Sequence, residues 1–185
     1  IGMQAEEYQV DRSELVDQPA CQKSLREDPS RLQTGPNMVG KIKGKTSNKG
    51  LLLFGHADKR PETFEWGKKR PSLEDRGGRL YGPGIADDVC GITAMLSAVE
   101  VFQSVKDQPD GDVLIASILG KQMGVFGTYG LMRRYGPVDS AIYVHPAESG
   151  DGLAELKMAS LGLLEYQITV EGKGPDTTDP HQAIF

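Results

Sequence analysis

The sequence predicts an α/β protein with a mostly parallel sheet flanked by helices, and three observations support this prediction. Two short, continuous apolar runs, LLLFG (51–55) and DVLIASI (112–118), are typical of strands buried on both faces. Residues 91–106 lie between them and carry apolar side chains at helical spacing on one face. A short helix at 127–136 and a strand at 140–145 follow. This alternation of strands and helices indicates parallel strands joined by right-handed crossovers.

The segments around this α/β layer have other patterns. Residues 1–36 are polar, which predicts irregular structure with helix remnants. The run MVGKIKG (38–44) alternates as a strand does, and TSNKG (46–50) predicts a hairpin turn before LLLFG. Residues 56–84 are rich in proline, glycine and charge and predict a long loop. From residue 154, two alternating runs without a helix between them predict the start of an antiparallel unit.

Composition and charge argue against several classes of function. Apolar residues make up 38% and charged residues 25% of the 185 residues, as in an ordinary globular protein. The net charge of −5 gives no basic surface for nucleic acid, so we predict no nucleic-acid partner. No apolar run approaches the ~20 residues of a membrane-spanning helix, so we predict no membrane partner. Cys21 and Cys90 form no C-x-x-C pair, which argues against a disulfide framework and favours a cytoplasmic protein.

Polar side chains follow the predicted strands at the points where these strands end. His56 follows LLLFG, residues 120–123 follow DVLIASI, and His145 ends the strand SAIYVH. Asp87 and Asp88 lie just before the helix at 91–106. Because ligands of open parallel sheets bind beyond the carboxyl ends of the strands, we expect these residues to form a site at one edge.

Each of these candidates also has a structural interpretation. His56 and Asp58 form an H-x-D pair, in which the imidazole can bind zinc while the carboxylate fixes its tautomer. A histidine at a strand end can equally be a packed or hydrogen-bonded side chain, and the same alternative holds for His145. Asp87 can bridge two cations with one oxygen to each, or Asp87 or Asp88 can cap the helix that follows.

Several motifs together resemble one family of enzymes. They are H-A-D-x-x-P (56–61), Trp66, GRLYGPGIADD (78–88) and GVFGT (124–128). They are similar to those of the zinc-dependent metallopeptidases that include acetylornithine deacetylase, succinyl-diaminopimelate desuccinylase, aminoacylase and glutamate carboxypeptidase. The resemblance runs from about Val39 to the end of the chain.

This resemblance implies a domain organisation, a cofactor and partners. Residues 1–155 would be the N-terminal part of a di-zinc aminopeptidase-like catalytic domain. Residues 156–185 would be the start of an inserted α+β lid or dimerisation domain. A complete chain would bind two zinc ions, with cobalt or manganese as alternatives, and would form a homodimer through the lid. The substrates would be N-acyl amino acids or short peptides.

The resemblance also assigns roles to residues at the site. His56 matches a zinc ligand, Asp58 matches the catalytic-site aspartate that orients it, and Asp87 matches the ligand that bridges both zinc ions. Lys121 stands where the family has its glutamate general base, and Gln122 stands where it has a glutamate zinc ligand.

A third departure from the family pattern is His145, which replaces an acidic zinc ligand but is itself a good one. A lysine ammonium is no base and repels a nearby dication, and a glutamine brings no charge to a metal. The sequence therefore leaves three hypotheses. The first is a metal-dependent hydrolase of amide or peptide bonds. The second is a catalytically impaired binding protein on the same scaffold, and the third is a subfamily with rearranged ligands.

Overall fold

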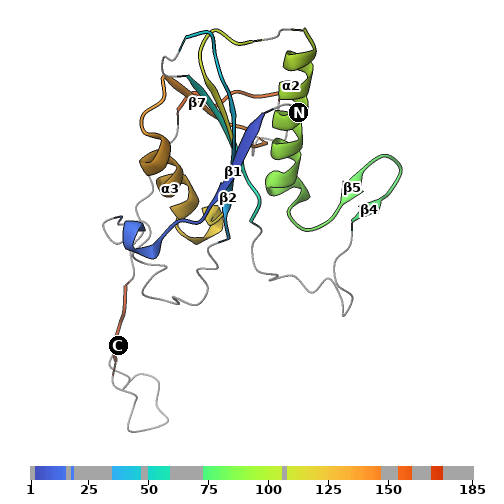
Figure 1. Cartoon of the computed structure of the whole chain (residues 1–185). Coiled ribbons are helices and arrows are strands. Elements are labelled where there is room, and N and C mark those ends of the chain that lie inside the picture. Colours follow the sequence, from blue (N-terminus) through green and yellow to red (C-terminus); the bar gives the residue numbers. More distant parts are fainter. Residues whose placement is uncertain are drawn as a thin grey trace.

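The computed structural model of the protein shows a sheet between two helices. Helix α2 (Cys90–Val105) covers one face of the sheet and helix α3 (Phe126–Tyr135) covers the other (Figure 1). The structure describes residues 3–15, 18, 35–46, 50–58, 73–105, 108–146, 154–159 and 168–172. None of the helices among these residues is long and apolar enough to cross a lipid bilayer.

The sheet has five strands in the order β1-β2-β6-β3-β7. Strand β3 runs parallel to both of its neighbours, β6 and β7, whereas β2 runs antiparallel to β6 and β1 runs antiparallel to β2. The strands are β1 (Gln4–Tyr8), β2 (Asn37–Ile42), β3 (Leu51–His56), β6 (Val113–Ile118) and β7 (Ser140–Tyr143). The predicted α/β class is confirmed, and the sheet is mixed, with its parallel strands on the side of β7.

Two predictions about the sheet are wrong. The hairpin between β2 and β3 does not form, because β6 lies between these strands and pairs with both. Strand β6 is apolar except for Ser117, so it is most stable with a partner on each side. The N-terminal segment contains β1 and the short helix η1 (Arg12–Leu15) instead of irregular structure alone. Strand β1 is an exposed edge strand, and its backbone pairing with β2 does not need apolar side chains.

The remaining described segments are short. Within the predicted long loop, β4 (Glu74–Asp75) and β5 (Leu80–Tyr81) form a small antiparallel ribbon beyond α2 (Figure 1). The irregular turn η2 (Ile85–Val89) leads into α2, and η3 (Lys121–Met123) follows β6. Residues 154–159 and 168–172 contain no strand or helix, and the domain boundary at 155 stays a prediction. Trp66 lies outside the described residues.

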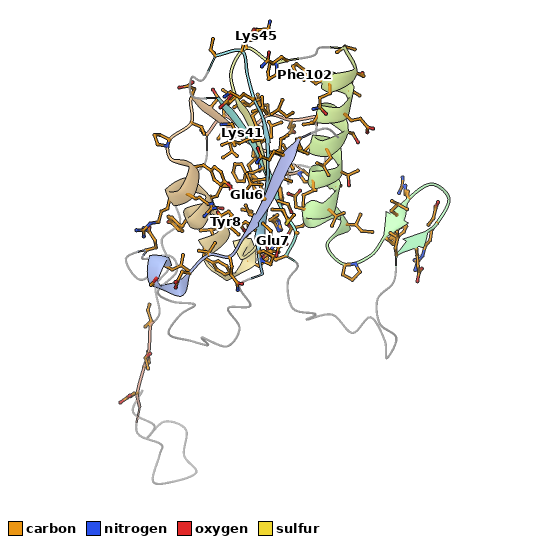
Figure 2. The ribbon with its side chains drawn as sticks, viewed as in Figure 1. Glu6, Glu7, Tyr8, Lys41, Lys45 and Phe102 are labelled. Carbon is orange, nitrogen blue, oxygen red and sulfur yellow. The ribbon has the colours of Figure 1, made fainter. Side chains whose placement is uncertain are left out.

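The core consists of two apolar layers, one on each face of the sheet. On the α2 side, Met95 and Val99 are buried, as the helical spacing in 91–106 predicts, together with Ile115 of β6. Ile92 and Leu96 pack against them, while Phe102 lies half-buried near the end of α2 (Figure 2). The layer on the α3 side is larger and contains Tyr8, Val10, Leu15, Val39, Leu52, Ala116, Ile118, Phe126 and Leu131.

One buried polar side chain, that of Asn37, connects the elements around the start of the segment that carries Lys121. Asn37 is fully buried, and its Nδ2 donates to the hydroxyl of Tyr8 and to the carbonyl of Gly127, both at 2.9 Å. Its Oδ1 accepts a hydrogen bond of 3.0 Å from the backbone N–H of Leu119. These bonds connect β1, β2 and α3 to the end of β6, and so fix the start of the segment that carries Lys121.

Candidate metal centre

The candidate residues lie at the carboxyl ends of three neighbouring strands. His56 is the last residue of β3 and pairs in register with Ile118, the last residue of β6. Lys121 and Gln122 follow β6 in η3, and His145 follows β7. The structure brings all four side chains within hydrogen-bonding distance of one carboxylate, that of Asp87.

The two oxygens of Asp87 have different surroundings. Its Oδ1 lies 2.6 Å from His56 Nε2, 2.9 Å from His145 Nε2 and 3.2 Å from Lys121 Nζ. Its Oδ2 accepts a hydrogen bond of 3.1 Å from the side-chain amide of Gln122. Burial works to raise the pKa of Asp87, but the close contacts of its carboxylate with His145 and His56 and the hydrogen bond from Lys121 outweigh it and hold this pKa far below its usual range. Asp87 is therefore an anion with nitrogen atoms around it.

The second nitrogen of each imidazole fixes the state of the first. Nδ1 of His56 lies 2.9 Å from the carbonyl oxygen of Asp58, and Nδ1 of His145 lies 2.8 Å from that of Pro146. A carbonyl oxygen only accepts hydrogen bonds, so both Nδ1 atoms are donors. In a neutral imidazole Nε2 is then an acceptor, and two acceptors face the carboxylate of Asp87. A cation between them, either a proton or a metal ion, removes this conflict.

The donor set fits a metal ion of the zinc type. One nitrogen of His56, one of His145 and one oxygen of Asp87 lie within 4.8 Å of one another. Zinc in catalytic sites binds three protein ligands of this kind and leaves further positions open. His56 is completely buried, whereas the side chain of Asp87 is 42% exposed, so the centre is open to solvent on the Asp87 side.

Asp58 contacts the segment η3 in addition to His56, the side chain that it is predicted to orient. Its Oδ1 lies 3.3 Å from His56 Nδ1 and accepts the backbone N–H of Lys121 at 3.3 Å. Its Oδ2 accepts the backbone N–H of Gln122 at 2.9 Å. Burial works to raise the pKa of Asp58, but the hydrogen bonds from His56 and from these N–H groups outweigh it and lower this pKa. Asp58 therefore links the end of β3 to η3.

Substituting Asp58 by asparagine keeps the shape of this side chain and removes its charge. We expect the zinc affinity of Asp58→Asn to fall about 10- to 100-fold, as for other groups that orient metal ligands. Competition with a zinc-binding dye measures this change, with Asp75→Asn in the exposed ribbon as the matched control. Equal zinc affinities of the two variants would contradict the linking role of Asp58.

The capping interpretation of Asp87 and Asp88 does not match the described hydrogen bonds. Those of Asp87 come from side chains, and Oδ2 of Asp88 accepts the backbone N–H of His56 at 3.1 Å. Asp88 is buried, its Oδ1 has no hydrogen-bond partner among the described residues, and burial raises its pKa. Asp88 thus fixes the backbone of His56, a role that the sequence analysis missed.

Tyr143 is a further neighbour of the histidines that the sequence analysis missed. Its ring stacks on His145 and on Phe54, with centroids 5.0 Å apart in each pair. The rings of His56 and His145 stack at 5.9 Å. The sequence contains a signal for this contact. Phe54 and His56 are two residues apart in β3 and so lie on one face of the strand, and Tyr143 and His145 have the same spacing at the end of β7 and just beyond it.

The fold and the convergent side chains define an α/β domain with a cluster of possible metal ligands at the carboxyl ends of its strands. Comparison with known proteins gives the family. A sequence model of Peptidase family M28 matches residues 37–142, more than half of the chain, and the chain belongs to this family. The resemblance to zinc-dependent metallopeptidases is therefore confirmed.

Individual relatives are longer than this chain. Carboxypeptidase G2 from Pseudomonas sp. (strain RS-16) is 29% identical over 149 residues, which cover 80% of this chain and 35% of the relative. N-formyl-4-amino-5-aminomethyl-2-methylpyrimidine deformylase from Bacillus subtilis (strain 168) is 32% identical over 111 residues, which cover 58% and 26%. The crystal structure of human carnosine dipeptidase 1 has a similar fold, with a TM-score of 0.50 and 18% identity, over 75% of this chain and 29% of that chain. The chain thus spans about a third or less of the length of these proteins.

Proposed function

We propose that the protein is a metal-dependent hydrolase of amide or peptide bonds, with N-acyl amino acids or short peptides as substrates. The observation that carries this proposal is the convergence of two Nε2 acceptors and one carboxylate oxygen, with both imidazole tautomers set by backbone carbonyls. The names of the relatives, a carboxypeptidase and a deformylase of an N-formyl compound, support an amide-type bond.

His56, Asp87 and His145 would hold the metal ion. A zinc ion in such a site polarises an amide carbonyl and lowers the pKa of bound water towards neutrality. Other residues of the chain would position these ligands and add charge beside them. Asp58 and Asp88 hold the backbone of η3 and of His56, and Lys121, whose side chain is 27% exposed, donates a hydrogen bond to Asp87. Lys121 therefore acts as a donor beside the metal ligands, and its role differs from that of the family's glutamate base.

The second candidate function is that of a binding protein on the same scaffold, which would bind a metal ion without turnover. The specific observation in its favour is Lys121, because its ammonium group occupies the position of the expected base. A homodimer formed through a lid domain and a cytoplasmic location stay predictions from the sequence.

Metal removal and reconstitution test these proposals. We expect chelator-treated protein to release no amino acid from N-acetyl and N-formyl amino acids or dipeptides, and zinc, cobalt or manganese to restore release. His145→Ala should abolish the restored activity, while Thr46→Ala, at the opposite end of the sheet, should retain it. Metal binding without turnover of any of these substrates would favour the binding protein. Absence of metal binding would contradict both functions.

A further inference from the structure

The surroundings of Asp87 differ from those of a site for two metal ions. We propose that this centre holds one divalent cation, and that the ammonium group of Lys121 takes the place of a second cation beside the carboxylate. This inference rests on the proposed metal site and concerns its stoichiometry. Asp87 would therefore pair a metal ion with a lysine, instead of bridging two metal ions.

One complete set of ligands lies on the Oδ1 side of Asp87. Nε2 of His56 and Nε2 of His145 approach this oxygen at 2.6 and 2.9 Å. The two rings stack with an interplanar angle of 18°, and their Nδ1 atoms are bound to backbone carbonyls. Both imidazoles are thus oriented towards the same point. A single cation among the two Nε2 atoms and Oδ1 would receive three protein ligands.

No comparable set lies on the Oδ2 side within the part of the chain that the structure describes. The group facing Oδ2 is the side-chain amide of Gln122, which is uncharged and donates a hydrogen bond to it. Of the other nearby carboxylates, Asp58 accepts two backbone N–H groups of η3. Asp88 accepts the N–H of His56 through Oδ2, and its buried Oδ1, which has no hydrogen-bond partner among the described residues, belongs to no group of three possible ligands there. His56, Asp87 and His145 form the one group of at least three such ligands in this part.

Lys121 already supplies positive charge to the carboxylate that two metal ions would have to share. Its Nζ lies 3.2 Å from Oδ1 of Asp87, as close as a direct ion pair. The charge of Asp87 is then shared on the Oδ1 side between this ammonium group and the first metal ion, so a second dication on Oδ2 would gain little attraction from the carboxylate and would be repelled by both positive charges. The ammonium group and the divalent cation together leave the single carboxylate with no charge to offer a further cation.

The backbone around Lys121 is built to hold it in this position. Gly120, directly before it, has a φ of 81°, a conformation that favours glycine, and a Cβ there would overlap the ring of Phe126. Asp58 then accepts the backbone N–H groups of Lys121 and Gln122. The backbone of Lys121 is therefore fixed on both sides, and the ion pair with Asp87 holds its ammonium group.

Metal stoichiometry tests this inference without an activity assay. Metal-free protein is dialysed to equilibrium against Zn²⁺, and bound zinc per chain is measured by elemental mass spectrometry. A parallel sample is loaded with Mn²⁺ for electron paramagnetic resonance. We expect one zinc ion per chain and the spectrum of isolated Mn²⁺ ions. Two zinc ions per chain, or the spectrum of an exchange-coupled manganese pair, would overturn the inference and leave the proposed metal site intact. Failure to bind any metal would overturn the proposed function itself.

Variants at position 121 test whether Lys121 limits the number of zinc ions that the chain binds. The double variant Lys121→Glu/Gln122→Glu replaces the ammonium group by a carboxylate and adds a second one, and it should bind a second zinc ion per chain. Lys121→Arg keeps the positive charge and should still bind one. Lys45→Glu/Gln108→Glu makes the same charge change on exposed residues at the opposite end of the sheet (Lys45, Figure 2) and should also bind one. A double variant at positions 121 and 122 that binds only one zinc ion would overturn the role given to Lys121.

Discussion

Asp87→Ala is expected to abolish zinc binding at concentrations that saturate the wild-type protein. Asp87 is the one anion among the three proposed ligands, and both histidine Nε2 atoms face its Oδ1. Its loss leaves two neutral imidazoles and the positive charge of Lys121 close to where the metal ion would bind. The loss of affinity should therefore exceed the roughly 100-fold that is typical when a group behind a metal ligand is removed.

Isothermal titration with Zn²⁺ measures this change. The matched control is Asp110→Ala, because the side chain of Asp110 is 80% exposed and lies in the loop before β6, at the other end of the sheet. Circular dichroism of both variants shows whether the fold is retained. An Asp87→Ala protein that is folded and binds zinc as tightly as the control would contradict the proposed centre.

Phe126→Ala is expected to lower the free energy of unfolding by about 3–5 kcal/mol, as for other fully buried aromatic side chains. The ring of Phe126 is completely buried between α3 and the sheet. It also packs against Gly120, so its removal leaves a cavity directly behind η3. Because domains are stable by only about 5–15 kcal/mol, this loss is a large part of the total.

Urea unfolding followed by circular dichroism tests the prediction for Phe126. Met132→Ala is the matched control in the same helix, since Met132 is 38% exposed and surface changes usually stay within about 0.5 kcal/mol. A loss of stability in Phe126→Ala no larger than in Met132→Ala would show that the α3 layer is not packed as described.

The sequence predicted well those elements whose apolar side chains follow the pattern of their burial. The apolar face of residues 91–106 corresponds to α2, and the run DVLIASI corresponds to β6. Strand β1 was missed because it is a polar edge strand stabilised through its backbone. The hairpin between β2 and β3 was wrong because a turn signal reports a local reversal of the chain, whereas β6, far along the sequence, fills the space between the strands.

Some features of the candidate site could likewise be predicted from the sequence, and others could not. Polar residues at strand ends predicted a cluster at one edge of the sheet, and the structure brings His56, Asp87 and His145 together. Their roles as ligands stay predictions. The two backbone N–H groups bound by Asp58 and the buried contact of Asp88 depend on loop geometry that no spacing reports. The turn at Gly120, which sets the backbone directly before Lys121, also depends on such loop geometry.

X-ray absorption spectroscopy of the zinc-loaded protein tests the proposed centre most directly, because it reports the atoms bound to the metal. The account predicts nitrogen and oxygen ligands at about 2.0–2.1 Å, with outer-shell scattering from two imidazoles and no sulfur. In His145→Ala the scattering should fall to that of one imidazole. A sulfur ligand at about 2.3 Å, or wild-type scattering from fewer than two imidazoles, would contradict a centre formed by His56, Asp87 and His145.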